Sequence, residues 1–401
     1  MAGVYERLGV RRIVNAKGPA TRLSGGPMRP EVVAAMAEAA SCCVDLLELH
    51  AAASRRLAEL TGAEAGLVTA GAAAALLLGA AACATGLDPA AMARLPESVT
   101  GRDRVVMVRS QRNQYDHAVR TVGLAIVEVG LPDRFAGAGC RDAEPWEIAA
   151  AIDARTAAVL WVADPLARPP LPEVAAVARS RGVPVLVDAA GRLPPKANLR
   201  RFLEEGADLV AFSGGKAIGG PQASGLLLGR RDLVAAAALQ MLDMDYPPGG
   251  FRPDPAFLPL DRLPGLPPHG IGRPCKVGKE QIVGLLTALE LFLVEDEAAR
   301  GAPRLGAVRA LAEELAGLPG VALEPRLDAP VPELALALDP GRARLDARRL
   351  LEALALGDPP IHADPGEIDR GRLVLRPDCL LPGDVGLVVR RLRALLGAPA
   401  P

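Results

Sequence analysis

The chain has 401 residues, which is enough for one large domain and a smaller second domain. Half of the residues are hydrophobic but only 3% are aromatic, so Ala, Leu and Val must build most of the core. The formal net charge is −1, and Lys and Arg form no basic block. This distribution argues against a large nucleic-acid-binding surface, which needs clustered positive charge.

The cysteines and the N-terminal sequence indicate a cytoplasmic protein. None of the six cysteines forms a Cys-x-x-Cys pair and only four histidines are present, so we expect reduced thiols and no metal site. The N-terminus lacks the apolar run of a signal peptide. The alanine-rich run at residues 70–84 is too short and too rich in Ala and Gly to span a membrane, and a buried helix is expected there.

Apolar and amphipathic segments alternate along the chain. Residues 1–30 are interrupted by Gly and Pro and should be irregular. Strands are expected at residues 67–71 (a range that includes the start of the next turn), 103–108, 157–163, 183–188, 209–212 and 226–229. Helices are expected at residues 31–40, 45–60, 72–84, 171–181 and 282–298. This alternation predicts an α/β fold with a mostly parallel sheet covered by helices on both faces, and an antiparallel strand at 226–229.

A small-residue turn, formed by Ala70, Gly71 and Ala72, joins the first strand of this sheet to the next helix. Free N–H groups and the helix dipole at such a helix N-terminus can bind an anion, and small side chains let the anion reach the backbone. Ala and Gly are frequent throughout the chain, so an ordinary turn explains the pattern about as well.

Two further polar segments follow strands. Residues 109–117 come directly after the strand at 103–108, where open α/β sheets bind ligands. His117 in this segment is expected on the following helix rather than in a catalytic role. Asp164 follows the strand at 157–163 and could contact a ligand, although an aspartate before proline is also an ordinary turn residue.

Asp188 ends a buried strand, and Lys216 lies one helix and one strand further on, in a glycine-rich loop. A lysine amine can form a Schiff base with an aldehyde cofactor, and a carboxylate can hold the proton on the pyridine nitrogen of that cofactor. The pair therefore predicts bound pyridoxal 5'-phosphate, with Lys216 as the catalytic residue. The alternatives are a surface lysine in a turn and a helix cap formed by Asp188.

Five segments, in the same order along the chain, together resemble one enzyme family. They are residues 9–16, 68–75, 183–188, 213–222 (Ser-Gly-Gly-Lys-Ala-Ile-Gly-Gly-Pro-Gln) and 270–280 (Gly-Ile-Gly-Arg-Pro-Cys-Lys-Val-Gly-Lys-Glu). The chain resembles the fold-type I pyridoxal-phosphate enzymes, and more closely the SelA-like branch that contains bacterial selenocysteine synthase and D-glucosaminate-6-phosphate ammonia-lyase. The match is specific for this branch but not for a substrate.

This resemblance implies a domain organisation. An N-terminal active-site segment at 1–30 would precede a large domain at 31–285 with a mostly parallel seven-stranded sheet, followed by a small α+β domain at 286–401. Active sites between subunits imply a homodimer or a higher homo-oligomer.

The resemblance also assigns residues to the cofactor and the substrate. Ala70, Gly71 and Ala72 would bind the cofactor phosphate, either Gln111 or Asn113 would cover the outer face of its ring, and Asp188, Ser213 and Lys216 would complete the site. Candidates for the substrate are Thr21 and Arg22 in the N-terminal segment, Arg273 among the glycines of 270–280, and Arg376 after a strand at 372–375. A linker that packs on the surface is the alternative for Thr21 and Arg22, and a surface turn with a helix start is the alternative for Arg273. Related members of the branch need not have an arginine at the position of Arg376.

The expected reaction takes place at the α-carbon of an amino acid or aminosugar acid. Our first hypothesis is an ammonia-lyase that performs α,β-elimination. Alternatives are an amino-acid racemase or aminotransferase, and a non-catalytic cofactor-binding scaffold. Selenium transfer on an aminoacyl-tRNA is disfavoured by the charge and by the lack of an added N-terminal RNA-binding module.

Overall fold

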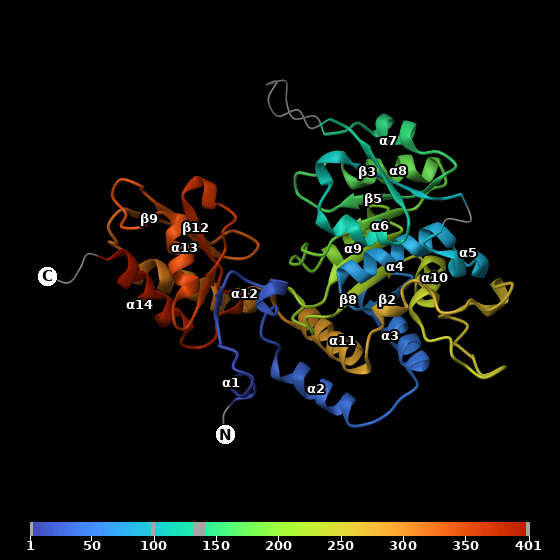
Figure 1. The fold of residues 1–401 in the computed structure, drawn as a ribbon, viewed down its shortest axis with the longest axis horizontal. Coiled ribbons are helices and arrows are strands. Elements are labelled where there is room, and N and C mark those ends of the chain that lie inside the picture. Colours follow the sequence, from blue (N-terminus) through green and yellow to red (C-terminus); the bar gives the residue numbers. More distant parts are fainter. Residues whose placement is uncertain (1–2, 98–100, 132–141, 398–401) are drawn as a thin grey trace. The chain divides into compact units, whose positions relative to one another are not determined.

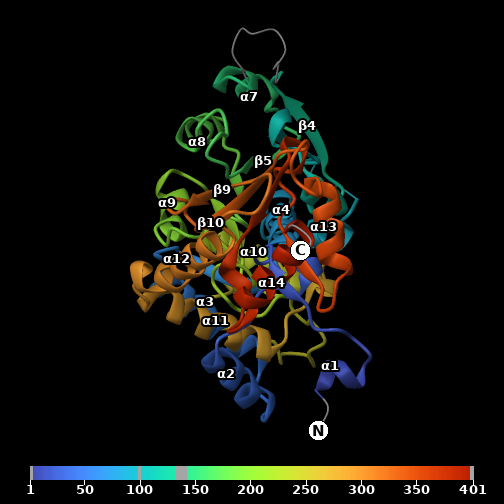
Figure 2. The ribbon, with the colours of Figure 1, turned by 90° about the vertical axis from the view of Figure 1, so that its left-hand side faces the viewer.

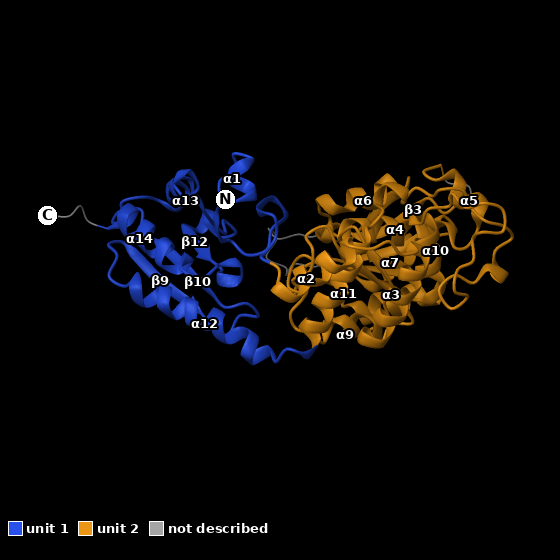
Figure 3. Cartoon of the chain, turned by 90° about the horizontal axis from the view of Figure 1, so that it is seen from below, with its two compact units in different colours: residues 1–27, 294–401 blue, residues 28–293 orange. Residues whose placement is uncertain are grey.

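The computed structural model of the chain describes residues 3–97, 101–131 and 142–397. Contacts divide the chain into two compact units (Figure 3). The larger unit comprises residues 28–293, and the smaller unit combines residues 1–27 with residues 294–401. The N-terminal segment therefore packs with the C-terminal part of the chain.

A seven-stranded sheet with the order β2-β8-β7-β6-β5-β3-β4 forms the centre of the larger unit (Figure 1). Its strands are β2 (Ala65–Thr69), β3 (Arg104–Val108), β4 (Ala125–Val129), β5 (Thr156–Val162), β6 (Val185–Asp188), β7 (Leu209–Ser213) and β8 (Gly225–Gly229). Of these seven, β8 runs antiparallel to both neighbours and the other pairs are parallel. The predicted α/β class, the mostly parallel sheet and the antiparallel strand after the lysine loop are confirmed.

Helices cover both faces of this sheet, because parallel neighbours are joined by right-handed crossover connections. Helix α4 (Ala72–Thr85) packs on β5 to β8, whereas α7 (Pro145–Ala151), α8 (Leu171–Ser180) and α9 (Asn198–Glu204) contact β3, β6 and β7 on the other side (Figure 2). The remaining helices of the unit are α2 (Pro30–Ala40), α3 (Leu46–Thr61), α5 (Pro89–Arg94), α6 (His117–Thr121), α10 (Arg231–Met241) and α11 (Lys279–Val294).

Helix α4 confirms the buried helix expected from the alanine-rich run. Alanine has the highest helix propensity, and most side chains of α4 are buried. A Cβ built on Gly79 would lie 3.0 Å from Leu186 of β6, so this glycine lets the helix approach the sheet closely. The position of α4 matters for function because its first turn begins at the carboxyl edge of the sheet.

The smaller unit contains a three-stranded antiparallel sheet, ordered β12-β10-β9. Its strands are β9 (Val321–Arg326), β10 (Glu333–Leu338) and β12 (Arg372–Leu375), and its helices are α12 (Glu297–Glu314), α13 (Ala347–Leu356) and α14 (Asp384–Leu396). A short parallel pair, β1 (Val14–Ala16) and β11 (Ile361–Ala363), attaches the N-terminal segment to this unit. A four-residue helix, α1 (Val4–Arg7), precedes β1.

The single long helix predicted at residues 282–298 is wrong. Helix α11 ends at Val294, and α12 begins at Glu297. Asp296 has extended backbone and caps the new helix, since its side chain accepts hydrogen bonds from the N–H groups of Ala298 and Ala299. The boundary between the two units falls at this break.

No helix in the described part of the chain is long and apolar enough to cross a membrane. Five cysteines are free thiols, namely Cys42, Cys43, Cys83, Cys275 and Cys379, and Cys140 lies outside the described residues.

Candidate active site

The carboxyl edge of the sheet brings several predicted site residues of the larger unit together. Asp188 is the last residue of β6 and is paired with Ala211 of β7. Ser213 ends β7 opposite Gly225 of β8, and Gly225 lies opposite Thr69 at the end of β2. The ends of adjacent strands therefore meet here, at the edge where open α/β sheets bind ligands.

Lys216 lies in a tight loop between β7 and β8. The Gly214 N–H donates to the Ser224 carbonyl at 2.9 Å, which closes the loop. A Cβ built on Gly215 would lie 2.7 Å from the Cα of Gln222, so the backbone packing requires glycine at this position. Backbone contacts therefore hold the loop in place. They also fix the position of the Lys216 backbone, from which the side chain extends.

The Lys216 amine reaches the turn that follows Asp188. Its Nζ is 3.8 Å from the position that a Cβ on Gly191 would occupy. The Asp188 side chain is 8% exposed, and its Oδ1 accepts a hydrogen bond from the Ala190 N–H at 3.0 Å. Asp188 forms no ion pair within 4 Å among the described residues, although its charge and that of Lys216 influence each other.

Burial shifts both groups toward their neutral forms. It raises the pKa of Asp188, against the Ala190 hydrogen bond and the charges of Lys216 and Arg192. It also lowers the pKa of Lys216; Asp188 opposes this effect and Arg192 adds to it. A carboxyl and an amine that share a buried place and are both perturbed by desolvation are typical of a functional site. A neutral amine is also the form that attacks a carbonyl carbon.

The turn between β2 and α4 can receive an anion at the same edge of the sheet. Gly71 is the N-cap of α4 and has φ 111°, a conformation that favours glycine, and the Thr69 hydroxyl donates to its carbonyl at 3.0 Å. A Cβ on Gly225 would lie 2.5 Å from Gly71 C and 2.7 Å from Ala72 N, so β8 passes directly beside the turn. Ala70 and Ala72 add only methyl groups, and the first N–H groups of α4 lack intrahelical acceptors.

The two ring-covering candidates differ in how their amides are used. Gln111 is 8% exposed; its Oε1 accepts from the Val162 N–H at 2.8 Å, and its Nε2 is buried without a partner among the described residues. Asn113 uses both polar atoms locally, because Oδ1 accepts from the Tyr115 N–H at 2.8 Å and Nδ2 donates to the Gln111 carbonyl at 3.2 Å. Val162 is paired with Asp188, so only Gln111 of the two offers an unsatisfied donor at this edge.

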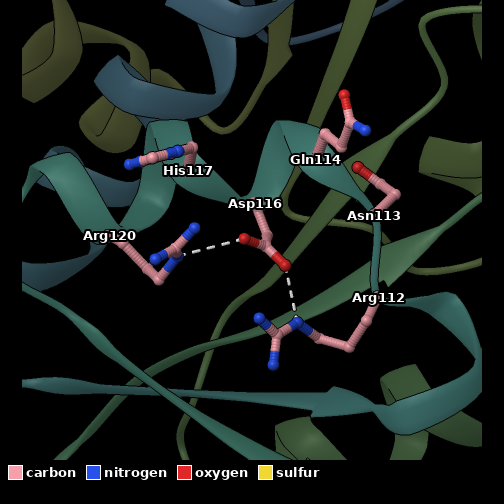
Figure 4. A pocket seen from close by; sticks show the side chains of 6 residues that line it. All are labelled: Arg112, Asn113, Gln114, Asp116, His117 and Arg120. Carbon is pink, nitrogen blue, oxygen red and sulfur yellow. Dashed lines mark hydrogen bonds and ion pairs between the residues drawn. The ribbon is translucent and has the colours of Figure 1, made fainter.

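A pocket of about 590 Å³ follows Gln111 along the chain (Figure 4). It is lined by Arg112, Asn113, Gln114, Asp116, His117 and Arg120. Asp116 is buried between the two arginines, with Arg120 Nε at 3.1 Å. Burial alone would raise the pKa of Asp116, but the hydrogen bonds and charges of Arg112 and Arg120 outweigh it and lower the pKa. His117 begins α6, as predicted, and points away from Asp116.

The ion pairs of this edge were not predicted from the sequence. The spacing of Arg112, Asp116 and Arg120 is four residues at each step, which is the signal for such pairs. Arg192 was also missed: it pairs with Asp164 and donates from Nε to the Ala163 carbonyl. No sequence pattern marks Arg192 except its place four residues after Asp188.

Arg273 is engaged by a carboxylate of the same unit. Its guanidinium lies 2.6 Å from one oxygen of Asp243, and His269 Nε2 lies 3.3 Å from the other. A hydrogen bond from the Asp245 N–H, followed by those from His269 and Arg273, lowers the pKa of Asp243 to about 2. An anionic ligand of Arg273 would have to share it with this carboxylate.

The other substrate candidates belong to the smaller unit. Thr21 and Arg22 begin a short turn of 3₁₀-helix and are exposed. Arg376 follows β12, as predicted, and donates from Nε to Glu333 at 2.9 Å, while its guanidinium lies 2.8 Å from Asp364. Two carboxylates therefore already hold Arg376.

Comparisons with known proteins show the family to which the chain belongs. The family model described as SelA, L-seryl-tRNA selenium transferase, matches residues 48–243. The chain is 33% identical to 5'-C-glycyluridine monooxygenase-decarboxylase of Streptomyces sp, over 98% of this chain and 93% of that protein. It is 29% identical to D-glucosaminate-6-phosphate ammonia lyase of Salmonella typhimurium, over 98% and 97% of the two chains. A solved structure of D-glucosaminate-6-phosphate ammonia-lyase is similar with a TM-score of 0.79 at 28% identity, over 98% of both chains.

The sheet, the small C-terminal domain and these structural neighbours define the class of protein: the chain has the fold of the fold-type I pyridoxal-phosphate enzymes. Within this class, the chain belongs to the SelA-like family.

Proposed function

We propose that this protein is a pyridoxal-phosphate-dependent ammonia-lyase that acts on an amino acid or aminosugar acid with a hydroxyl group on the β-carbon. The observation that carries the proposal is the Lys216 amine beside the turn after Asp188, with both groups shifted toward neutrality by burial. The similarity to an ammonia lyase over nearly the whole of both chains supports this reaction over racemisation, transamination or a non-catalytic role.

The described residues fit the cofactor at its phosphate, its pyridine nitrogen and its aldehyde. The first N–H groups of α4, at Gly71 and Ala72, suit its phosphate. The buried carboxyl of Asp188 suits its pyridine nitrogen, and the Lys216 amine suits its aldehyde. The buried Nε2 of Gln111 is a donor without an acceptor among the described residues, as expected beside an oxygen atom or a ring supplied by a ligand.

Bound pyridoxal phosphate supplies an electron sink for negative charge at the substrate α-carbon. Asp188 holds the proton at the pyridine nitrogen, and its buried position keeps this hydrogen bond away from water. Lys216 takes the proton from the α-carbon, for which its lowered pKa is suitable. The β-hydroxyl then leaves as water, and a second water molecule hydrolyses the resulting imine, which gives a 2-keto acid and ammonia.

We assign substrate binding to Thr21, Arg22, Arg273 and Arg376, and a further cofactor contact to Ser213 at the end of β7. The guanidinium groups suit carboxylate or phosphate oxygens. Asp243, Glu333 and Asp364 hold Arg273 and Arg376 in fixed orientations, so a substrate anion would join an existing network. We further propose that the enzyme acts in the cytoplasm as a homodimer or a larger homo-oligomer.

A second candidate is the oxidative decarboxylation of an amino acid. It is favoured by the 33% identity to a monooxygenase-decarboxylase, which exceeds the 29% identity to the ammonia lyase at equal coverage of this chain. In this reaction an amino acid and O₂ give an amide, CO₂ and water. The same Lys216 and Asp188 would serve both reactions, so the products must distinguish them.

The decisive experiment is a product screen with the purified protein and added pyridoxal phosphate. Hydroxylated amino acids and aminosugar acids, each with and without a 6-phosphate, are assayed for ammonia, keto acid and oxygen uptake. We expect ammonia and keto acid in equal amounts without oxygen uptake. Oxygen uptake matched by CO₂ would support the second candidate, and release of ammonia from none of the compounds would contradict the first. The Lys216→Ala variant is the control for contaminating activity.

A further inference from the structure

The pocket shown in Figure 4 lies at one end of a network of alternating charges. Glu128 of β4 pairs with both Arg109 and Arg112. Asp116 pairs in turn with Arg112 and Arg120. Three arginines and two carboxylates leave one positive charge uncompensated within the network, and an arginine stands at each end of it. Arg120 is the end that lines the pocket.

Arg120 is fixed by this network but still has unused donors. Its Nε donates to Asp116 at 3.1 Å, and Asp116 is only 4% exposed, so a buried carboxylate sets the orientation of the guanidinium. No described residue accepts a hydrogen bond from either Nη atom of Arg120. The side chain is half-exposed, and its Nη atoms therefore remain available to a ligand in the pocket.

Two further side chains of the pocket have no partner among the described residues. Gln114, His117 and Arg120 are spaced three residues apart, along a turn of 3₁₀-helix (Gln114–Asp116) that continues directly into α6. Side chains at this spacing are neighbours on a helical surface. No described residue forms a hydrogen bond or an ion pair with the side chain of Gln114 or His117. One side of the pocket therefore offers an amide, an imidazole and a guanidinium to a ligand.

We infer that this pocket binds the carboxylate group of a small organic anion, with Arg120 as its main contact. The two Nη donors of a guanidinium match the two oxygens of a carboxylate in a planar, bidentate pair. One carboxylate also neutralises the single positive charge left in the network, whereas a phosphate dianion would exceed it. The cavity of about 590 Å³ falls within the range of small-molecule sites, so it has room for the rest of the anion. The inference goes beyond the proposed function and does not depend on it.

Binding is measured first by NMR, independently of turnover. The ring signals of the four histidines are assigned by single substitutions, and His117 then reports on the pocket. Acetate is titrated into the full-length protein saturated with pyridoxal phosphate, and chloride keeps the ionic strength constant. We expect a saturable shift of the His117 signal, and a dissociation constant at least about fivefold higher in Arg120→Gln.

The matched control is Arg109→Gln. It removes the same charge from the opposite end of the same network, but residue 109 does not line the pocket, so acetate binding should be unchanged. The signal of the buried His50 shows whether each variant retains its fold. Arg120→Lys is the second variant: it keeps the charge beside Asp116 but cannot form the bidentate pair, and it should also weaken acetate binding.

Two results would overturn the inference. One is a His117 signal that does not respond to acetate at constant ionic strength. The other is equal weakening of acetate binding in Arg109→Gln and Arg120→Gln, because net charge rather than contact with Arg120 would then hold the anion.

Competition then identifies the source of the carboxylate. The acetate titration is repeated with Lys216→Ala, which does not consume substrate, in the presence of each compound that the unmodified protein turns over in the product screen. A weaker apparent affinity for acetate would assign the pocket to the substrate, and an unchanged affinity would assign it to a separate carboxylic acid. If the screen finds no substrate, the proposed function fails, while the acetate titration still decides whether this site exists.

Discussion

Asp188 and Asp364 are both buried aspartates next to a strand, but the protein surrounds them differently. Asp364 is 7% exposed and lies between Lys17 and Arg376, at 3.1 and 2.8 Å. Asp188 is 8% exposed and has no ion-pair partner within 4 Å among the described residues; only the Ala190 N–H donates to it. The first carboxylate is compensated by two side chains of the protein, whereas we propose that the bound cofactor compensates the second.

This difference separates structural charges from functional ones. A buried charge that already has its ion-pair partners contributes to the structure, but its hydrogen-bonding positions are occupied and cannot bind a ligand. A buried charge without a partner is costly to the folded protein, and it persists where function requires it. By this criterion Lys216, Asp188 and the Gln111 amide form the part of our proposed site that the described residues leave uncompensated, whereas Glu333 and Asp364 orient Arg376 for the substrate contact that we propose.

The largest effect is expected at the uncompensated amine. Lys216→Arg retains the positive charge but cannot form a covalent link to an aldehyde, so we expect the rate of ammonia release to fall by at least about 10⁴-fold. The absorbance band of the lysine-linked cofactor should also disappear. Lys276→Arg, at an exposed lysine, is the control and should retain both properties. Retention of more than a tenth of the activity in Lys216→Arg would show that another group does the chemistry.

The second prediction compares the two aspartates directly. Asp188→Asn should lower the rate of ammonia release by about 10²–10³-fold and shift the cofactor absorbance, because a carboxylate no longer holds the pyridine proton. Asp364→Asn should leave the absorbance unchanged and lower the free energy of unfolding by about 2 kcal/mol; this is less than for a fully buried pair, since Arg376 is partly exposed. Absorbance spectra and urea denaturation of both variants measure the two effects. The opposite outcome, in which Asp364→Asn changes the spectrum and Asp188→Asn does not, would reverse our assignment.

A third, smaller effect is expected where backbone alone forms the site. Gly225→Ala places a Cβ 2.5 Å from Gly71 C and 2.7 Å from Ala72 N. The turn between β2 and α4, which we propose to bind the cofactor phosphate, must therefore shift. We expect the affinity for pyridoxal phosphate to weaken about 10–100-fold, measured by absorbance titration of the cofactor-free protein. Gly265→Ala is the matched control, because no atom lies within 4 Å of a Cβ at that position. Equal affinity in the two variants would show that this turn does not bind the phosphate.

Much of the fold was predictable because it depends on local patterns. Apolar runs of four to seven residues marked most strands of the large sheet, and alternation with helices gave its parallel order. Strands β1 and β11 were missed, since three residues carry no periodicity, and β4 was not predicted either. The break before α12 was missed because it depends on a single capping aspartate, Asp296, within an otherwise helical composition.

The candidate site was predictable only in part, for a related reason. Lys216, Asp188 and the small-residue turn are marked by glycine and by strand ends, which are local features of the sequence. The choice between Gln111 and Asn113 depends on their hydrogen bonds: Gln111 bonds to the distant backbone of Val162, and Asn113 bonds to neighbouring backbone. The sequence alone does not show which backbone groups lie near each side chain. The partners of Arg376 depend on long-range pairing of β1, β10 and β11.

The smallest predicted effect concerns the free energy of unfolding of the cofactor-free protein. In an Asp188→Asn background, where no carboxylate at that position faces the amine, the further change Lys216→Met should stabilise the fold by about 0.5–2 kcal/mol, since it removes a desolvated cation. The sign of the pH dependence follows from the lowered pKa of Lys216. The unfolded chain keeps its proton up to about the ordinary value of 10.5, whereas the folded protein loses it earlier.

The stability of the lysine-containing protein should therefore rise with pH above the folded pKa, and the advantage of Lys216→Met should shrink as the pH approaches 10.5. Urea denaturation of the two proteins at several pH values measures this difference. An advantage that does not change between neutral pH and 10.5 would mean that packing of the methionine, rather than removal of the charge, stabilises the variant. In that case burial of the Lys216 amine would cost the fold nothing, and the contrast drawn between compensated and uncompensated charges would hold for Asp188 alone.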